Sequence, residues 1–129
     1  MAKVVVIGGA NVDVKARSSA EFIAATSNPG MVVTAAGGVA RNIAHNLALL
    51  GIGTALISVV GDDAYGQFIL DETARAGVDI SLVKRLAGRT GVYVALLDAS
   101  GEMTGAINDM AILANLALTD ADERALLAA

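Results

Sequence analysis

The feature that most constrains the fold is an adjacent glycine pair, Gly37–Gly38, that opens directly into a segment with helical periodicity. Two glycines permit positive φ angles and let another group approach the backbone closely. The segment stops at Gly51, and its apolar residues Ile43, Leu47 and Leu50 recur at the spacing of one helix face. We predict a helix whose first amides are free for a ligand, although many strand-to-helix turns carry glycines for structural reasons alone.

Two continuous apolar runs flank this helix along the chain. The first is VVVIGG after Lys3, and the second is TALISVV over Thr54–Val60. Such runs are typical of parallel strands buried on both faces, and a helix between them makes a βαβ unit. A second helix is expected over Tyr65–Ala76, ending at Gly77. The pattern predicts an α/β fold with a mainly parallel sheet.

Two other segments, 15–36 and 88–107, have the alternation of half-buried strands rather than a helical pattern. In the first, Glu21–Thr26 and Met31–Ala35 are predicted as short strands around an Asn-Pro-Gly turn. The second is predicted as a β-hairpin. Because the βαβ core does not need these strands, we expect a small separate sheet with an uncovered apolar surface that mediates a homodimer.

Composition narrows the classes of function. The 129 residues suit one domain, and no apolar run reaches the ~18–20 residues that span a bilayer. The N-terminus lacks the features of a signal peptide, so we expect a cytoplasmic protein without a membrane partner. No cysteine is present, and the net charge of −4 without basic clusters argues against nucleic acid. Small molecules are the expected partners.

Several kinds of catalytic apparatus are missing from the sequence. Neither G-x-x-x-x-G-K-[ST] nor G-x-G-x-x-G occurs, His45 is the only histidine, and no serine lies in G-x-S-x-G. Asp62, Asp63 and Asp71 invite a metal site, but acidic residues at a helix start are more often caps and dipole partners. We therefore assign no metal ligand.

The polar residues that remain form a set suited to hydroxyl groups. Asn11 and Asp13 follow the first strand, where alternation puts both side chains on one face; the alternative is a polar turn. With the Gly37–Gly38 backbone and Asn42, they offer the paired donors and acceptors that vicinal sugar hydroxyls need. Asn108–Asp109 follow the hairpin and are either ligand contacts or the start of a helical segment. Further on, Thr119-x-x-Asp122 predicts a capping box.

The pattern Gly37-Gly38-x-Ala40-x-Asn42-x-Ala44, followed by Gly51 and Gly61, is similar to the N-terminal signature of the ribokinase-like, or PfkB, carbohydrate kinases. The opening VVVIGGANVD and the segments 61–66 and 76–79 agree with it in the family's order. Within the family, the segments 37–44, 96–103 and 106–110 look most like pseudouridine kinases.

This resemblance implies a three-layer α/β/α fold with a small β-stranded lid, in which 15–36 and 88–107 are the lid segments. It implies ATP- and Mg²⁺-dependent phosphorylation of a sugar hydroxyl, which for pseudouridine is the ribose 5′-hydroxyl. Val39 stands where ribokinases carry a lysine, which favours a nucleoside over free ribose. The implied substrate-binding residues are Asn11, Asp13, Gly37, Gly38, Val39, Asn42, Asn108 and Asp109.

Family members also have a C-terminal half with a Gly-Ala-Gly-Asp motif, whose aspartate is the general base. That motif is absent from these 129 residues. The resemblance therefore implies that residues 1–129 are an incomplete ribokinase-like domain, the N-terminal, substrate-binding portion of the kinase, with no catalytic residue and no ATP pocket. The alternatives are a non-catalytic nucleoside-binding or interaction module, or a kinase for another sugar or nucleoside.

Overall fold

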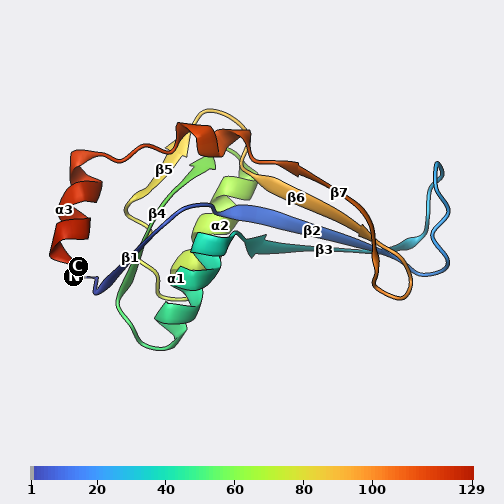
Figure 1. Ribbon diagram of the computed structural model, residues 1–129, viewed down its shortest axis with the longest axis horizontal. Coiled ribbons are helices and arrows are strands. Elements are labelled where there is room, and N and C mark those ends of the chain that lie inside the picture. The colour runs from blue at the N-terminus through green and yellow to red at the C-terminus, as the bar shows by residue number, and fades with distance from the viewer. Residues whose placement is uncertain (1) are drawn as a thin grey trace.

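A computed structural model describes residues 2–129 and contains two β-sheets and four helical segments (Figure 1). One sheet has three strands in the order β1-β4-β5, and the other has four in the order β3-β2-β6-β7. The elements are β1 (Val4–Ile7), β2 (Asn11–Ser18), β3 (Gly30–Gly37), α1 (Val39–Leu49), β4 (Thr54–Gly61), α2 (Ala64–Arg75), β5 (Val83–Leu86), β6 (Val92–Leu97), β7 (Met103–Asp109), the 3-10 helix η1 (Ala111–Asn115) and α3 (Asp120–Ala128).

The three-stranded sheet is parallel, as the two apolar runs predict. β4 lies in its centre and is buried at every position, with β1 on one side and β5 on the other. β1 differs from the prediction because it is only partly buried, and Ile7 is exposed. The reason is its place at an edge: within residues 2–129, β4 is the one strand that pairs with β1.

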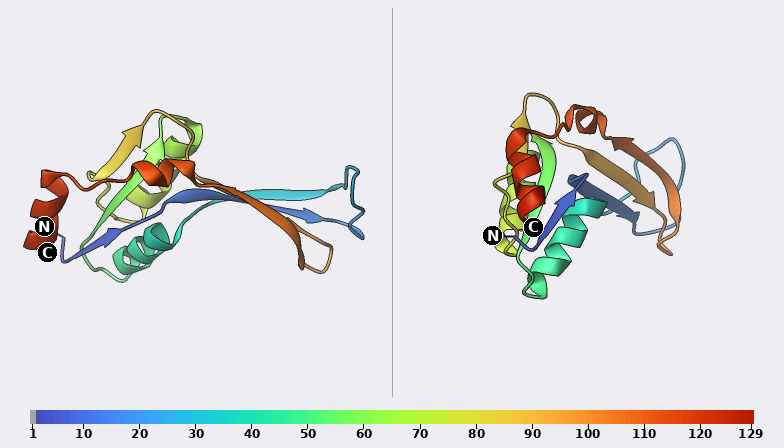
Figure 2. Two further views of the ribbon diagram at one scale, coloured as in Figure 1. Left: turned by 45° about the horizontal axis from the view of Figure 1, so that its top comes forward. Right: turned by 60° about the vertical axis from the view of Figure 1, so that its left-hand side comes forward.

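Helical segments lie on both faces of this sheet. On one face, Leu56 and Val60 of β4 join a core cluster with Ala44 of α1 and Ile69 of α2. The opposite face carries Lys84 of β5, whose ammonium group pairs with Asp122 of α3. Lys84 pairs in register with Val59, which lies between Ser58 and Val60 in β4. Because side chains alternate along a strand, Lys84 faces the side opposite to Leu56 and Val60. The arrangement is the layered α/β fold expected from the sequence (Figure 2).

The predicted core face of α1 is wrong. Ile43 and Leu50 are 48% and 76% exposed, while Ala40 and Ala44 are buried in their place. The small residues are buried because α1 packs closely against the end of β1: a Cβ at Gly8 would lie only 2.9 Å from the Cβ of Ala40. At this distance the helix can turn only small residues towards β1.

The four-stranded sheet extends away from the helices, and we call it the projecting sheet (Figures 1 and 2). β2 pairs with β3 antiparallel and with β6 parallel, and β7 completes the hairpin predicted from the sequence. The strand predicted over Glu21–Thr26 is wrong, because residues 19–29 form a loop. Asn28 closes that loop by bonding both the backbone N–H and the carbonyl of Ile23.

Two helix starts confirm the capping predictions. Asp63 is the N-cap of α2 and accepts a hydrogen bond from Gly66 N at 2.8 Å. Thr119 and Asp122 form the expected capping box at the start of α3. None of the helices within residues 2–129 has both the length and the apolar content that crossing a bilayer requires.

Candidate functional site

Asn11 and Asp13 form a hydrogen-bonded pair at the start of β2. The Nδ2 group of Asn11 donates to Oδ1 of Asp13 at 2.7 Å, which requires both side chains on one face of the strand, as predicted. Asn11 is buried and Asp13 is partly exposed. The alternative of a polar turn is wrong, because both residues belong to a regular strand that pairs on both sides. The pair therefore lies in regular sheet structure, and a ligand can reach its partly exposed carboxylate.

Gly37 and Gly38 lie directly beside this pair. Gly37 is opposite Asn11 in the β2–β3 register, and a Cβ at position 37 would collide with the Asp13 carboxylate. Gly38 has a φ of 99° and is the N-cap of α1, and a Cβ there would collide with the Gly9 carbonyl. Glycine at both positions lets the β3–α1 turn and the Asp13 carboxylate occupy the same small region.

The sheet register shows which other predicted residues share the face of Asp13. Asp13 pairs with Tyr93 of β6, and Tyr93 pairs in turn with Asn108 of β7. Paired residues project from the same face, so Asp13, Tyr93 and Asn108 form one row across the sheet. Sequence reasoning missed Tyr93, although the alternation of β6 was recognised, because the register between strands was not available.

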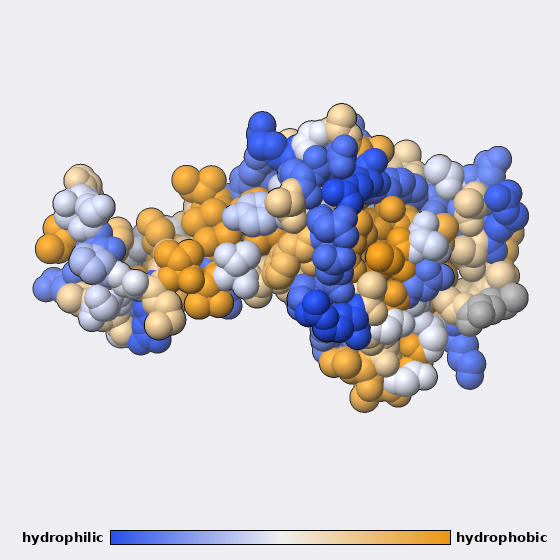
Figure 3. Space-filling model, turned by 180° about the vertical axis from the view of Figure 1, so that it is seen from behind, coloured by the Kyte–Doolittle hydropathy of each residue, from blue (hydrophilic) through white to orange (hydrophobic). Residues whose placement is uncertain are grey.

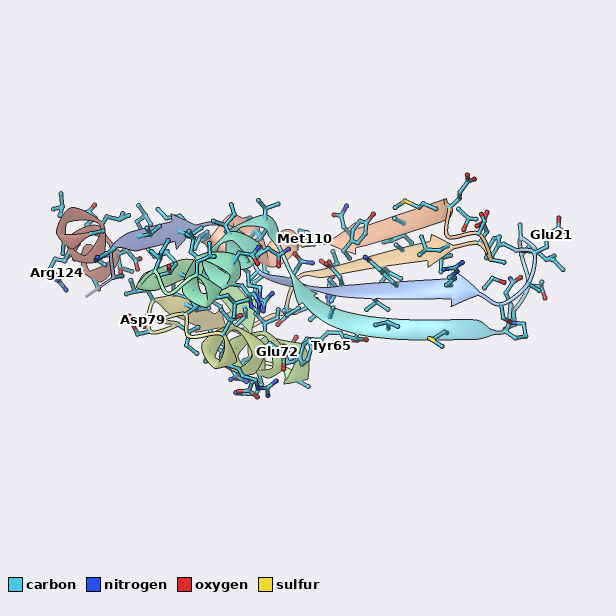
Figure 4. The ribbon with its side chains drawn as sticks, turned by 90° about the horizontal axis from the view of Figure 1, so that it is seen from below. Glu21, Tyr65, Glu72, Asp79, Met110 and Arg124 are labelled. Atoms are coloured by element: carbon cyan, nitrogen blue, oxygen red, sulfur yellow. The ribbon has the colours of Figure 1, made fainter. Side chains whose placement is uncertain are left out.

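Asp109 projects from the opposite face and does not join this row. It is the last residue of β7, one position beyond Asn108, so alternation turns it away. Arg89 donates to Oδ2 of Asp109 at 2.8 Å and holds the pKa of that carboxyl below its usual range. The helical segment η1 begins only after Met110, which lies at the junction of the projecting sheet and the helices (Figure 4).

The first turn of α1 supplies two more of the predicted residues. Val39 is 78% exposed at the start of the helix, and the exposed Asn42 donates its backbone N–H to Gly38 O at 2.8 Å. Beside them, Arg41 is buried, and burial lowers its pKa while the charge of Glu72 acts in the opposite direction. Arg41 lies outside the apolar face predicted from Ile43, Leu47 and Leu50, so sequence reasoning missed its burial.

Of the three acidic residues near α2, Asp63 is a cap, Asp62 is an ion-pair partner, and Asp71 accepts a hydrogen bond from the side chain of Gln67. Oδ1 and Oδ2 of Asp63 accept hydrogen bonds from the side chain and the backbone of Thr90. Burial opposes its ionisation, but these bonds and that from Gly66 outweigh it and hold the pKa of Asp63 below its usual range. Asp62 pairs with Arg85 at 2.9 Å. In the part of the chain that the structure describes, no three His, Cys, Asp or Glu side chains gather as metal ligands would.

Solved structures share this architecture. A carbohydrate kinase from Agrobacterium tumefaciens superimposes with a TM-score of 0.85 at 29% identity, over 100% of this chain and 43% of its own. Arabidopsis thaliana ribokinase complexed with ribose and ATP superimposes with a TM-score of 0.75 at 27% identity, over 84% of this chain and 36% of its own. The fold is that of the ribokinase-like sugar kinases.

The whole sequence, residues 1–129, matches the pfkB family carbohydrate kinase, and the chain belongs to that family. Its relatives include the pseudouridine kinase of Escherichia coli strain K12, 49% identical over 110 residues, or 84% of this chain and 35% of the relative. An uncharacterised sugar kinase of the same strain is 45% identical over 113 residues, 87% of this chain and 31% of the relative. The chain thus spans about a third of the length of these curated relatives.

Proposed function

We propose that this chain forms the acceptor-binding part of an ATP-dependent nucleoside kinase whose acceptor is the ribose 5′-hydroxyl of pseudouridine. The observation that carries the proposal is the Asn11–Asp13 pair, held against the Gly37–Gly38 turn. The choice of nucleoside is supported by the 49% identity to a relative named pseudouridine kinase.

The pair has the chemistry that a vicinal diol requires. A carboxylate is an acceptor only, so Asp13 accepts from ribose hydroxyls in charge-assisted hydrogen bonds. Its bond to Asn11 fixes the carboxylate plane, and Oδ1 of Asn11 adds an acceptor on the same face. A ligand without the hydroxyls would leave these acceptors unpaired, which costs more than a lost methylene contact. Gly37, Gly38, Val39, Asn42 and Asn108 complete the proposed site; Asp109 lies on the other face of the sheet.

ATP would supply the phosphoryl group, with Mg²⁺ neutralising its charge. The residues present do not fit these groups. The sequence carries no P-loop, and the metal-ligand clusters that would hold the cation are not found among residues 2–129. We therefore assign no residue of this chain to ATP or Mg²⁺, and we propose that the chain alone binds the acceptor without turning over ATP. The proposed use of ATP favours a cytoplasmic location.

Two alternatives are tested by the same assay. One is a non-catalytic module that binds a nucleoside; the other is a kinase for a different acceptor, favoured by the 35% identity to a guanosine-inosine kinase of Exiguobacterium acetylicum. ADP formation is measured for the 129-residue chain and for a version extended to the relatives' length, with pseudouridine, guanosine, inosine and ribose. We expect turnover by the extended version alone, fastest with pseudouridine. Comparable turnover by the short chain would contradict the proposal that this chain binds only the acceptor. A faster reaction with guanosine would indicate that guanosine, and not pseudouridine, is the acceptor.

We also propose that the projecting sheet mediates a homodimer. Large apolar side chains are exposed on its strands, and the one face seen in the surface view carries orange patches on the extended part of the molecule (Figure 3). The exposed apolar residues on the strands are Met31, Val32, Val33, Leu96, Met103 and Ile107. An exposed apolar sheet of this kind is a typical protein interaction surface.

A further inference from the structure

Arg41 is a buried cation without an ion-pair partner. Its exposure is 6%, and none of the salt bridges formed by residues 2–129 includes it. A buried charge that is not paired is costly unless hydrogen bonds satisfy its donors. The contacts of this guanidinium therefore show what holds it in place.

Three neighbours from three elements fix the guanidinium. Its Nε donates to Oγ1 of the buried Thr73 on α2 at 3.1 Å, and Nη1 donates to the carbonyl of Ala36 at 3.3 Å. Nη2 lies 2.9 Å from Nδ1 of His45, one turn further along α1. Ala36 immediately precedes the Gly37–Gly38 turn. The planar group is thus held between α1, α2 and the end of β3, next to the proposed acceptor site.

The fourth contact fixes the orientation of Asn42. Nη1 of Arg41 lies 3.2 Å from Oδ1 of Asn42. A guanidinium has only donors, so the atom facing it must be the amide oxygen, and the NH₂ group of Asn42 must point the other way. Within residues 2–129, no hydrogen bond of that NH₂ group is found, and Asn42 is exposed. Helical side chains lean towards the preceding turn, which for Asn42 is the turn that begins at Gly38.

We infer that Arg41 is a positioning residue that holds the Asn42 amide so that Nδ2 donates to a hydroxyl oxygen of the acceptor. This inference rests on the proposed function. Asn42 then presents a donor where Asp13 presents an acceptor, and a sugar hydroxyl can satisfy both kinds of group. Without Arg41 the amide could turn over and offer its oxygen instead, so half of its orientations would be unproductive.

A double-mutant cycle on the 129-residue chain tests the inference, with pseudouridine binding measured by titration calorimetry. Asn42→Ala removes the donor, Arg41→Met removes the group that orients it, and the double variant removes both. We expect Asn42→Ala to raise Kd by about fivefold, the effect of one neutral hydrogen bond, and Arg41→Met to raise it by about twofold, because half of the amide orientations become unproductive. The double variant should raise Kd no further than Asn42→Ala alone. Arg75→Met, at an exposed position on α2, is the control and should leave Kd unchanged.

Unfolding in urea is followed for every variant, because a purely structural Arg41 would weaken binding through loss of the fold. In that case Arg41→Met would raise Kd by the same factor whether position 42 is asparagine or alanine, and this result would overturn the inference. An unchanged Kd for a folded Arg41→Met variant would overturn it as well. Failure of the unaltered chain to bind pseudouridine or any other nucleoside would instead contradict the proposed function, and the inference with it.

Discussion

At the scale of single residues, the candidate site depends on how closely Gly37 and Asp13 approach each other. The Asp13 carboxylate occupies the space that any side chain at position 37 would need. This closeness lets the end of β3 support a carboxylate that is already bonded to Asn11.

We predict that Gly37→Ala weakens pseudouridine binding by about tenfold or more, because the new methyl group must push the Asp13 carboxylate out of its bond with Asn11. Gly105→Ala is the matched control, since Gly105 also lies in a strand and a Cβ there meets nothing within 4 Å. Titration calorimetry compares the two. Equal dissociation constants for the two variants would show that the carboxylate position does not matter.

Sequence reasoning could assign a side chain to one face of a strand wherever side chains alternate with a period of two residues. The alternation of Asn11 and Asp13 was sufficient to put them on one face. Arg41 could not be found in this way, because its burial depends on the close approach of α1 to Gly8 and on partners in α2 and β3. Which of Asn108 and Asp109 shares the face of Asp13 could be decided only from the β2–β6 and β6–β7 registers, which join strands rather than neighbours in sequence.

At the scale of elements, α3 is joined to β5 by an ion pair whose carboxylate is buried. Asp122 is fully buried, caps its own helix through Thr119 and accepts a hydrogen bond from Lys84. Burial opposes its ionisation, but Lys84 and Thr119 outweigh burial and hold the pKa of Asp122 below its usual range. Because the folded state lowers this pKa, the ionised carboxylate stabilises the fold above the unfolded value and the contribution is lost as pH falls through the folded value.

We predict that Asp122→Asn lowers Tm at pH 7 by about 5–10 °C, because it leaves Lys84 without its buried partner. The stability of the unaltered chain should fall on acidification below about pH 4, and the fall should be smaller for the variant, which has no carboxyl at position 122. Thermal unfolding followed by circular dichroism between pH 3 and 7 measures both effects. Asp120→Asn, exposed in the same first turn, is the control. Parallel pH curves for the chain and Asp122→Asn would contradict this account.

The strands β4 and β6 were predicted correctly, and so was the capping box of α3, because each depends on a local pattern. The loop over 19–29 was not, because its closure depends on Asn28 bonding back to Ile23, and Ala25 there takes a φ of 61°. Periodicity in a short window does not reveal such a turn.

At the scale of the whole molecule, the projecting sheet sets the shape. Glu21 lies at its far tip and Arg124 lies at the opposite end of the molecule (Figure 4). Val32 and Val33 are adjacent in β3 and therefore expose apolar surface on opposite faces of the sheet. Val33 shares its face with Lys15 and Asp13.

We predict that the chain dimerises and that Val32→Asp or Val33→Asp, whichever lies in the interface, raises the dimer dissociation constant at least about tenfold, because it buries an unpaired charge. Sedimentation velocity over a concentration series measures this. Leu127→Asp on α3 removes an even more exposed apolar side chain outside the sheet and should have no effect. A chain that stays monomeric throughout would contradict the proposed interface.

The measurement that tests the central claim most directly is the affinity of the chain for pseudouridine with and without the Asp13 carboxylate. Asp13→Asn keeps an oxygen for the bond from Asn11 but loses the charge, so we predict a Kd higher by about tenfold to a hundredfold at an unchanged Tm. Asp98→Asn, in the β6–β7 turn, should leave Kd unchanged. A folded Asp13→Asn variant that binds pseudouridine as tightly as the unaltered chain would contradict the assignment of this site.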